Sequence, residues 1–171
     1  MRHLELEALI HGERAERVFE NVLRWDRYPG LAPHVRSTTV HRTLPDTRGS
    51  SSWELYFRSG LLRWTEDEVF DREALTISYE QSEGDFEEFS GGWLLQRPGE
   101  TGRGDDAVAL NFTCRFDFGV DSLAGILDPI AERVIKETVA WAVTGMFENV
   151  TLRTETGTRL TAADAVGTGE G

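Results

Sequence analysis

The chain has 171 residues, enough for one domain with a sizeable core, and its 39% hydrophobic and 28% charged residues are ordinary for a globular protein. Its formal charge of -12 excludes nucleic acid and anionic membrane surfaces as favoured partners, because both would be repelled. The only cysteine, Cys114, leaves no intrachain disulfide and no cysteine-based zinc site.

The N-terminal sequence MRHLELEALI carries acidic residues inside its first apolar run, unlike a signal peptide. No segment reaches the ~20 apolar residues of a membrane span. We therefore expect a cytoplasmic protein without membrane insertion. Of the 18 basic residues only Lys136 is a lysine, and this arginine bias favours a GC-rich bacterial source.

The first predicted elements are a strand and a pair of helices. Residues 4–10, LELEALI, alternate apolar and acidic side chains as a half-buried strand does. Apolar residues at helical spacing from Ala15 predict a helix, which Pro29 and Gly30 interrupt. A second short helical turn is expected before Pro33.

From Val35 onward the pattern is that of consecutive strands joined by short turns. Ser59 and Gly60 form a hairpin signal, and Gly91 and Gly92 inside a strand pattern indicate a bulge or a sharp bend. The order of elements predicts an α+β, helix-grip arrangement. In it, a curved antiparallel sheet of about seven strands wraps a long C-terminal helix, with two short helices after the first strand.

The long helix is apolar around more than half of its girth, although a surface helix needs only one apolar stripe. One row comprises Leu127, Ile130, Val134, Thr138, Trp141 and Gly145. The neighbouring flank comprises Ile135, Val139, Ala142, Val143 and Met146, and the polar side comprises Glu132, Arg133, Lys136, Glu137, Thr144 and Glu148. We expect one row to pack on strands and the other to cover a space, a fully packed core being the alternative.

Asp128 precedes Pro129 and is the expected cap or kink point of this helix. The elements predict one domain over residues 1–152. Residues 153–171 are small and polar, and we expect them to form a disordered tail.

Three stretches, EFSGGWLLQR, LNFTCRFDFG and SLAGILDPIAERVIKETVAWAVTGMFENV, resemble the polyketide cyclase/dehydrase and lipid-transport family of the START-like or Bet v 1-like superfamily (SRPBCC). The resemblance covers about Leu4 to Val150 and lies near the aromatase/cyclase and coenzyme-Q-binding branches. It implies a deep apolar cavity between sheet and long helix, where relatives hold polyketides, quinones or lipids. Actinobacterial antibiotic biosynthesis fits the arginine-rich composition. Aromatase relatives carry a pocket arginine where Glu68 stands here, and its absence favours a different cyclisation chemistry or no aromatisation.

Two carboxylates are the leading catalytic candidates. Glu66 and Glu68 share a strand face with Trp64 and Phe70, which predicts that this face points inward. A carboxyl group in an apolar pocket has a raised pKa and can act as general acid or base near neutral pH. The alternative, which we favour for Glu66 and weigh equally for Glu68, is a solvated strand end with both side chains in water.

Tyr79 is a third catalytic candidate, because a buried phenol can orient a carbonyl or donate to an enolate. The more common alternative is a core tyrosine with a satisfied hydroxyl. The predicted substrate-binding residues are Trp64, Gln81, Trp93, Phe112, Cys114, Val134, Thr138 and Trp141. Core packing explains the tryptophans equally well. The four histidines lack metal-ligand spacing, so we expect no metal and no cofactor.

These observations favour a polyketide cyclase that binds a linear or partly cyclised polyketide in an apolar cavity. Positioning and proton transfer by Glu68 and Tyr79 would promote ring formation. The alternative is a non-catalytic carrier for a quinone-like or lipid ligand, and a third hypothesis is a subunit that acts through protein contacts. A homodimer is compatible with each of these hypotheses.

Overall fold

The structure is a computed structural model that describes residues 1–100, 106–153 and 159–161. Its helices are α1 (Ala15–Val22), the 3-10 helix η1 (Trp25–Arg27), α2 (Tyr28–Leu31) and α3 (Asp121–Met146). Its strands are β1 (Arg2–Ile10), β2 (Val35–Arg42), β3 (Arg48–Phe57), β4 (Gly60–Asp71), β5 (Thr76–Gly84), β6 (Glu88–Gln96), β7 (Val108–Asp117), β8 (Val150–Arg153) and β9 (Arg159–Thr161).

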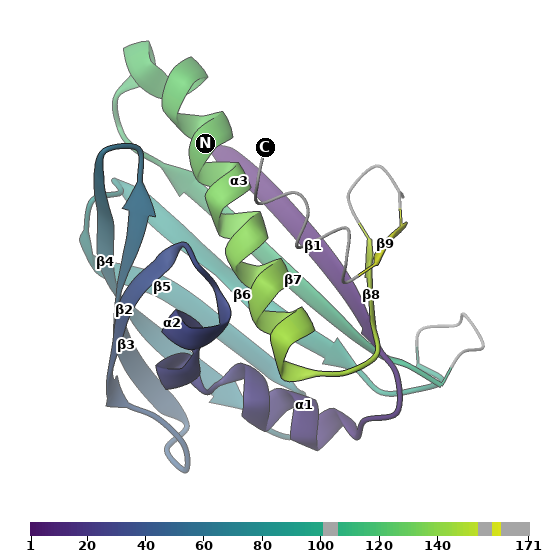
Figure 1. Cartoon of the computed structure of the whole chain (residues 1–171). Coiled ribbons are helices and arrows are strands. Elements are labelled where there is room, and N and C mark those ends of the chain that lie inside the picture. The colour runs from purple at the N-terminus through teal and green to yellow at the C-terminus, as the bar shows by residue number, and fades with distance from the viewer. Residues whose placement is uncertain (101–105, 154–158, 162–171) are drawn as a thin grey trace.

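The strands form one antiparallel sheet in the order β2-β3-β4-β5-β6-β7-β1-β8-β9, nine strands among the described residues. The long helix α3 lies across one face of this curved sheet, and α1 and α2 lie near the C-terminal end of that helix (Figure 1). The predicted helix-grip fold class is therefore confirmed. Strands β8 and β9 extend the sheet beyond the seven strands expected from the sequence.

The C-terminal region differs in part from the sequence-based expectation. Strand β8 crosses the predicted boundary at residue 152, and β9 lies inside the segment predicted to be a disordered tail. The remainder of that tail lies outside the described residues. Helix α3 begins at Asp121 after the N-cap Val120, so Pro129 lies inside the helix and Asp128 is not its cap.

Gly91 marks a close approach of neighbouring strands, and of the bulge or sharp bend expected there the bulge is absent. Strand β6 pairs in continuous register with β5 and β7 through this residue. A Cβ atom at Gly91 would lie 2.1 Å from the Thr113 carbonyl oxygen and 2.4 Å from the Tyr79 hydroxyl oxygen. The missing side chain therefore lets the Tyr79 ring lie over β6 and reach β7.

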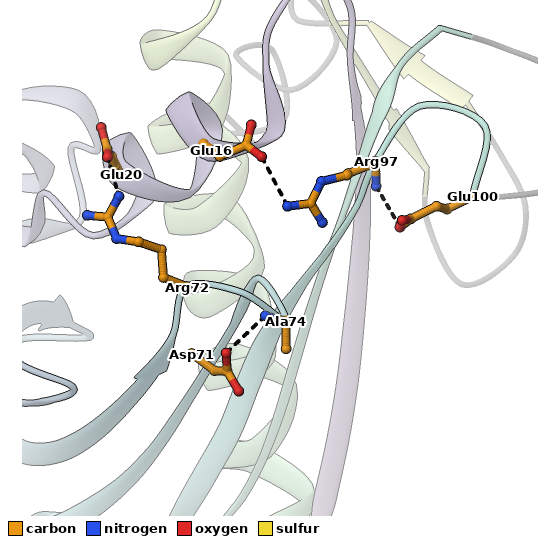
Figure 2. Close-up of polar contacts among 7 residues, drawn as sticks. All are labelled: Glu16, Glu20, Asp71, Arg72, Ala74, Arg97 and Glu100. Carbon is orange, nitrogen blue, oxygen red and sulfur yellow. Dashed lines mark hydrogen bonds and ion pairs between the residues drawn. The ribbon is translucent and has the colours of Figure 1, made fainter.

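Helix α1 is held to the sheet by an apolar face and two ion pairs. Its buried residues are Ala15, Val18, Phe19 and Val22, at the spacing of one helical face. On its exposed side Glu20 pairs with Arg72 at 2.6 Å and Glu16 pairs with Arg97 at 3.0 Å (Figure 2). Exposed ion pairs of this kind contribute at most about 1 kcal/mol each, so the burial of apolar side chains is what mainly holds α1 to the sheet.

None of the helices in the described part of the chain has the length and apolar character of a membrane span.

We expect the substitution Gly91→Ala to lower the free energy of unfolding by about 1–3 kcal/mol, because the added methyl group overlaps a backbone oxygen. Urea denaturation measures this change. Gly125→Ala is the matched control, since a Cβ atom there meets nothing within 4 Å and alanine favours the helix. Equal stability of wild type and Gly91→Ala would contradict the close approach.

Candidate functional site

A cavity lies between α3 and the inner face of the sheet. It is lined by Trp25, Tyr28, Trp53, Leu55, Trp64, Glu66, Tyr79, Phe89, Trp93, Phe112, Ile135, Thr138 and Val139. The space between these residues is about 460 Å³ when the open mouth is included, but the cavity itself is only about 50 Å³. Ligand pockets for drug-sized molecules span roughly 300–1,000 Å³. A cavity thus lies where the family resemblance implies one, but it is small and not deep, because aromatic side chains fill most of the space.

The walls of the cavity are mostly aromatic, with eight aromatic residues among the thirteen that line it. Trp53 and Trp64, which pair across β3 and β4, stack with a 2° interplanar angle and 5.9 Å between ring centroids. Tyr28 meets Trp53 edge-on, with centroids 5.2 Å apart. Offset and edge-to-face contacts of this kind add to the free energy of area burial. They make the walls flat and well ordered.

The segment from η1 to α2 contributes one side of the cavity. Trp25 and Tyr28 are both almost fully buried, at 2% and 1% exposure. The Tyr28 hydroxyl donates to the Val22 carbonyl at 2.8 Å, and the Thr38 hydroxyl donates to the Trp25 carbonyl at 2.8 Å. These bonds fix a short, irregular segment over the sheet.

Glu66 and Glu68 form a buried carboxyl pair on the inner face of β4. Glu66 is 5% exposed and lines the cavity, whereas Glu68 is 1% exposed and lies next to it, outside the lining. The Trp64 indole N–H donates to Glu66 Oε1 at 2.8 Å, and the Ser51 hydroxyl donates to Glu68 Oε2 at 2.5 Å. The Trp53 indole N–H in turn donates to Ser51 Oγ at 2.9 Å. The inward direction expected from strand parity is thus present, and the solvated alternative is wrong for both carboxylates.

The two carboxyl groups are electrostatically coupled. Burial raises the pKa of Glu66 well above the ordinary glutamate range, and the hydrogen bond and negative charge of Glu68 raise it further. Burial also raises the pKa of Glu68, while hydrogen bonds from Glu66 and from neighbouring donors lower it. Two close carboxylates in a desolvated site share a proton rather than both ionise. We therefore assign the proton of the pair mainly to Glu66, whose pKa is raised by both burial and the neighbouring carboxyl group.

Tyr79 also lines the cavity, but its hydroxyl is used by the protein. The hydroxyl donates to the Thr113 carbonyl at 2.7 Å, across the surface left open by Gly91. Burial raises the pKa of Tyr79 well above its usual value. The hydroxyl proton of Tyr79 therefore points at the backbone, as expected for a core tyrosine with a satisfied hydroxyl.

The other predicted binding residues divide into two groups. Trp64, Trp93, Phe112 and Thr138 line the cavity, and the Thr138 hydroxyl donates to the Val134 carbonyl at 2.8 Å. Gln81, Cys114, Val134 and Trp141 are not among the lining residues.

Three of these four residues outside the lining differ in their surroundings. The Gln81 amide donates to the Phe86 carbonyl at 2.8 Å, so it holds the β5–β6 turn. Cys114 is buried, and burial raises its pKa to about 12. The Trp141 ring lies 4.9 Å from the His34 ring.

Glu137, placed on the polar side of the helix by the sequence pattern, is 8% exposed. It lies between Arg133 at 3.0 Å and His34 at 3.5 Å. Packing of α3 against the residues after α2 therefore buries part of the expected polar side. No group of three or more potential metal-ligating side chains occurs within the described ranges.

Sequence reasoning missed several residues that line the cavity: Trp25, Tyr28, Trp53, Leu55 and Phe89. Strand alternation in WELYF and FEEFS contained a signal for the last three. Trp25 and Tyr28 lie in a short, aperiodic turn, where no pattern gives the direction of a side chain. The long helix contributes Ile135 and Val139 from its second apolar flank, whereas all the helix residues predicted to bind substrate belong to the first row, of which only Thr138 lines the cavity.

We expect Glu66→Gln to change how stability depends on pH. A carboxyl group with a raised folded-state pKa contributes stability below its unfolded pKa of about 4.3, and this contribution is lost as pH rises through the folded pKa. The free energy of unfolding of wild type should therefore fall relative to Glu66→Gln from pH 5 to pH 9, by about 1.4 kcal/mol per unit of pKa elevation. Urea titrations across this range test it. The exposed Glu80, changed to Gln, is the control, and parallel curves for wild type and Glu66→Gln would refute the assignment.

Comparison with solved structures places the fold among START-like proteins. A protein of Thermus thermophilus is 22% identical, with a TM-score of 0.70, over 85% of this chain and 94% of that chain. A START superfamily protein from Mycobacterium smegmatis is 14% identical, with a TM-score of 0.66, over 85% and 97% of the two chains. The Zhui aromatase/cyclase from a Streptomyces species is 16% identical, with a TM-score of 0.60, over 99% and 93%. A comparison with curated protein sequences finds no significant match.

At these identities the structures establish the fold alone. The sequence itself matches the family described as polyketide cyclase/dehydrase and lipid transport over residues 13–142, which is more than half of the chain. This match begins at the first helix and includes β4, the aromatic strands and most of α3. The chain belongs to the polyketide cyclase/dehydrase and lipid-transport family.

Proposed function

We propose that this protein is a polyketide cyclase in which the Glu66–Glu68 pair exchanges protons with a substrate held in the aromatic cavity. The observation that carries the proposal is a buried carboxyl pair with one member, Glu66, at the wall of an apolar cavity. Carboxyl groups with raised pKa values are suited to acid and base roles near neutral pH. The family description and the fold shared with an aromatase/cyclase support this reaction class.

An intramolecular aldol cyclisation needs one proton removed and one proton delivered. A proton leaves the carbon between two carbonyl groups, that carbon bonds to a distant ketone carbon, and the ketone oxygen takes up a proton. A pair that holds one proton can accept the first and supply the second, so it ends as it began. Loss of the new hydroxyl group with a neighbouring proton, as water, would extend the ring toward aromaticity. Neither step needs an oxidant or a reductant.

The residues around the pair fit this cycle. Trp64 fixes Glu66 through Oε1, which leaves the other oxygen for proton exchange. Ser51 donates to Glu68 and stabilises the charge that stays on the pair. The flat walls formed by Trp53, Trp64 and Trp93 would hold a forming ring, bring the reacting carbons together and exclude water.

The size of the cavity limits which part of a substrate enters. About 50 Å³ is far less than a whole extended chain occupies, so only a short segment of a substrate would enter. The remainder of a longer polyketide would stay at the mouth between helix and sheet. We therefore propose that the enzyme forms a single ring in each binding event.

A carrier for a small apolar ligand is the second candidate. The observation that favours it is the lining itself, in which Glu66 is the only ionisable carboxyl among thirteen residues. A carrier would co-purify with a hydrophobic ligand and would tolerate loss of that carboxyl. Native mass spectrometry of wild type and Glu66→Gln separates the two functions, because the cyclase proposal predicts turnover that depends on Glu66.

The direct test is the product profile of a linear polyketide thioester mimic incubated with purified protein. Wild type should enrich one cyclised product over the spontaneous mixture. Glu66→Gln and Glu68→Gln should each lower that rate by about 10²–10⁴-fold, the range typical of general acid–base groups. Glu80→Gln, an exposed carboxyl on β5, should leave the rate unchanged. Product ratios equal to those without protein would end the cyclase proposal.

A further inference from the structure

We infer that Trp25 is a positioning residue for the Glu66–Glu68 pair: its indole N–H stabilises the negative charge on Glu68 and thereby keeps the proton of the pair on Glu66. The inference deepens the proposed function, and its catalytic meaning rests on that function. A charge fixed on Glu68 leaves Glu66, at the cavity wall, as the carboxyl group that donates a proton. The placement of the charge itself can be measured without any cyclisation reaction.

Two buried polar atoms beside the pair lack a partner. Among the side chains that the structure describes, the Trp25 indole N–H and Glu68 Oε1 are both buried, and neither forms a hydrogen bond of normal geometry. The first is a donor and the second an acceptor. Leaving either group unpaired in the interior is unfavourable, so each group completes the other.

The two unpaired groups lie within electrostatic reach of each other. Burial raises the pKa of Glu68, and hydrogen bonding by Glu66, Ser51 and Trp25 lowers it. Ser51 donates to Oε2 of Glu68, at 2.5 Å. The indole of Trp25 therefore serves the remaining oxygen, Oε1, and donors reach both oxygens of Glu68. A carboxylate that receives several hydrogen bonds holds its charge more readily than its neighbour does.

The surroundings of Trp25 fix the direction of its ring. Its backbone N–H donates to the Leu23 carbonyl at 2.9 Å, and its carbonyl accepts from the Thr38 hydroxyl at 2.8 Å. The ring contacts Trp53 and Tyr28, with centroids 5.7 Å and 5.4 Å apart. The indole cannot turn away from the acids without breaking these contacts, so the donor is held in place before any ligand arrives.

Trp25 also connects Glu68 with the cavity. Glu68 lies outside the lining, whereas Trp25 and Glu66 belong to it. Two other tryptophans of the lining use their indole N–H groups in the same way: Trp64 donates to Glu66, and Trp53 reaches Glu68 through a serine hydroxyl. These rings form the wall while their N–H edges serve the acids, and Trp25 is the third member of this arrangement.

The other groups around Glu68 do not replace this donor. Asp67, its neighbour on β4, adds negative charge, and Tyr79, opposite it on β5, directs its hydroxyl to the β7 backbone. Three exposed arginines line a separate groove that also includes Glu68: Arg42, Arg48 and Arg115. Within the described ranges none of the three forms an ion pair with Glu68, and Arg42 pairs with Asp46 at 2.9 Å instead.

Carbon-13 NMR of the glutamate carboxyl carbons tests the inference, with Glu66→Gln and Glu68→Gln used to assign the two signals. In Trp25→Phe the Glu68 carbon should move toward the shift of a protonated carboxyl group, and the Glu66 carbon toward that of a carboxylate. The midpoint of the Glu68 titration should rise by about one pH unit, as expected for the loss of one hydrogen bond to a charged group. A loosened wall alone would not move the two signals in opposite directions.

Two further variants separate the N–H group from the ring. Trp25→benzothienylalanine keeps the shape of the ring and replaces the N–H by sulfur, so it should repeat the opposite shifts even if Trp25→Phe folds poorly. Trp93→Phe is the matched control, because Trp93 lines the same cavity and contacts the Trp25 ring, with centroids 6.2 Å apart. It should leave both carboxyl signals as they are in wild type. Circular dichroism checks the folding of each variant.

The cyclisation assay adds a second readout. With the linear thioester mimic, both Trp25 variants should lower kcat by about tenfold and leave KM nearly unchanged, because the charge on the pair and not the binding of substrate is altered.

The outcomes distinguish this inference from the proposed function. If both Trp25 variants titrate as wild type does, or if Trp93→Phe changes the signals as Trp25→Phe does, the positioning inference is overturned and the cyclase proposal is untouched. If the signals shift as expected but wild type leaves the product ratios of the linear precursor unchanged, placement of the charge by Trp25 stands and the cyclase proposal falls.

Discussion

The interior is arranged around two carboxyl groups that share one face of β4. Burying Glu66 and Glu68 side by side is unfavourable unless donors surround them and one proton stays between them. The structure supplies the donors with the indole of Trp64 and the hydroxyl of Ser51, to which the Trp53 indole itself donates. The tryptophans of β3 and β4 therefore have two roles, since they form an apolar wall and also donate hydrogen bonds to the acids.

The fold supplies what a curved sheet alone lacks, which is a cover for this site. Helix α3 provides Ile135, Thr138 and Val139, and the short segment from η1 to α2 provides two buried aromatic rings. Gly91 lets a tyrosine of β5 reach across β6 and end on the β7 backbone. Each of these features removes water from the neighbourhood of the acids, and the raised pKa values follow from that exclusion.

Sequence patterns predicted on which side of the sheet a residue lies better than they predicted how far its side chain is buried. Strand parity placed Glu66 and Glu68 inward, yet parity does not show whether a helix covers that part of the strand. Glu66 was therefore expected in water, whereas 5% of it is exposed. Glu137 was expected outside for the converse reason, because a helical wheel does not include the neighbouring His34. Trp25 lies in a turn without periodicity, and only the folded chain shows its direction.

The protonation state of the pair decides how it would meet a substrate in the proposed reaction. A neutral ligand with a carbonyl group is recognised by the protonated pair, because the proton can be donated to it. Burial raises the pKa of Glu66 above its ordinary range, so the protonated form persists to higher pH than for an exposed glutamate. The same desolvation that keeps water from the acids thus equips the pair for proton transfer with an uncharged substrate.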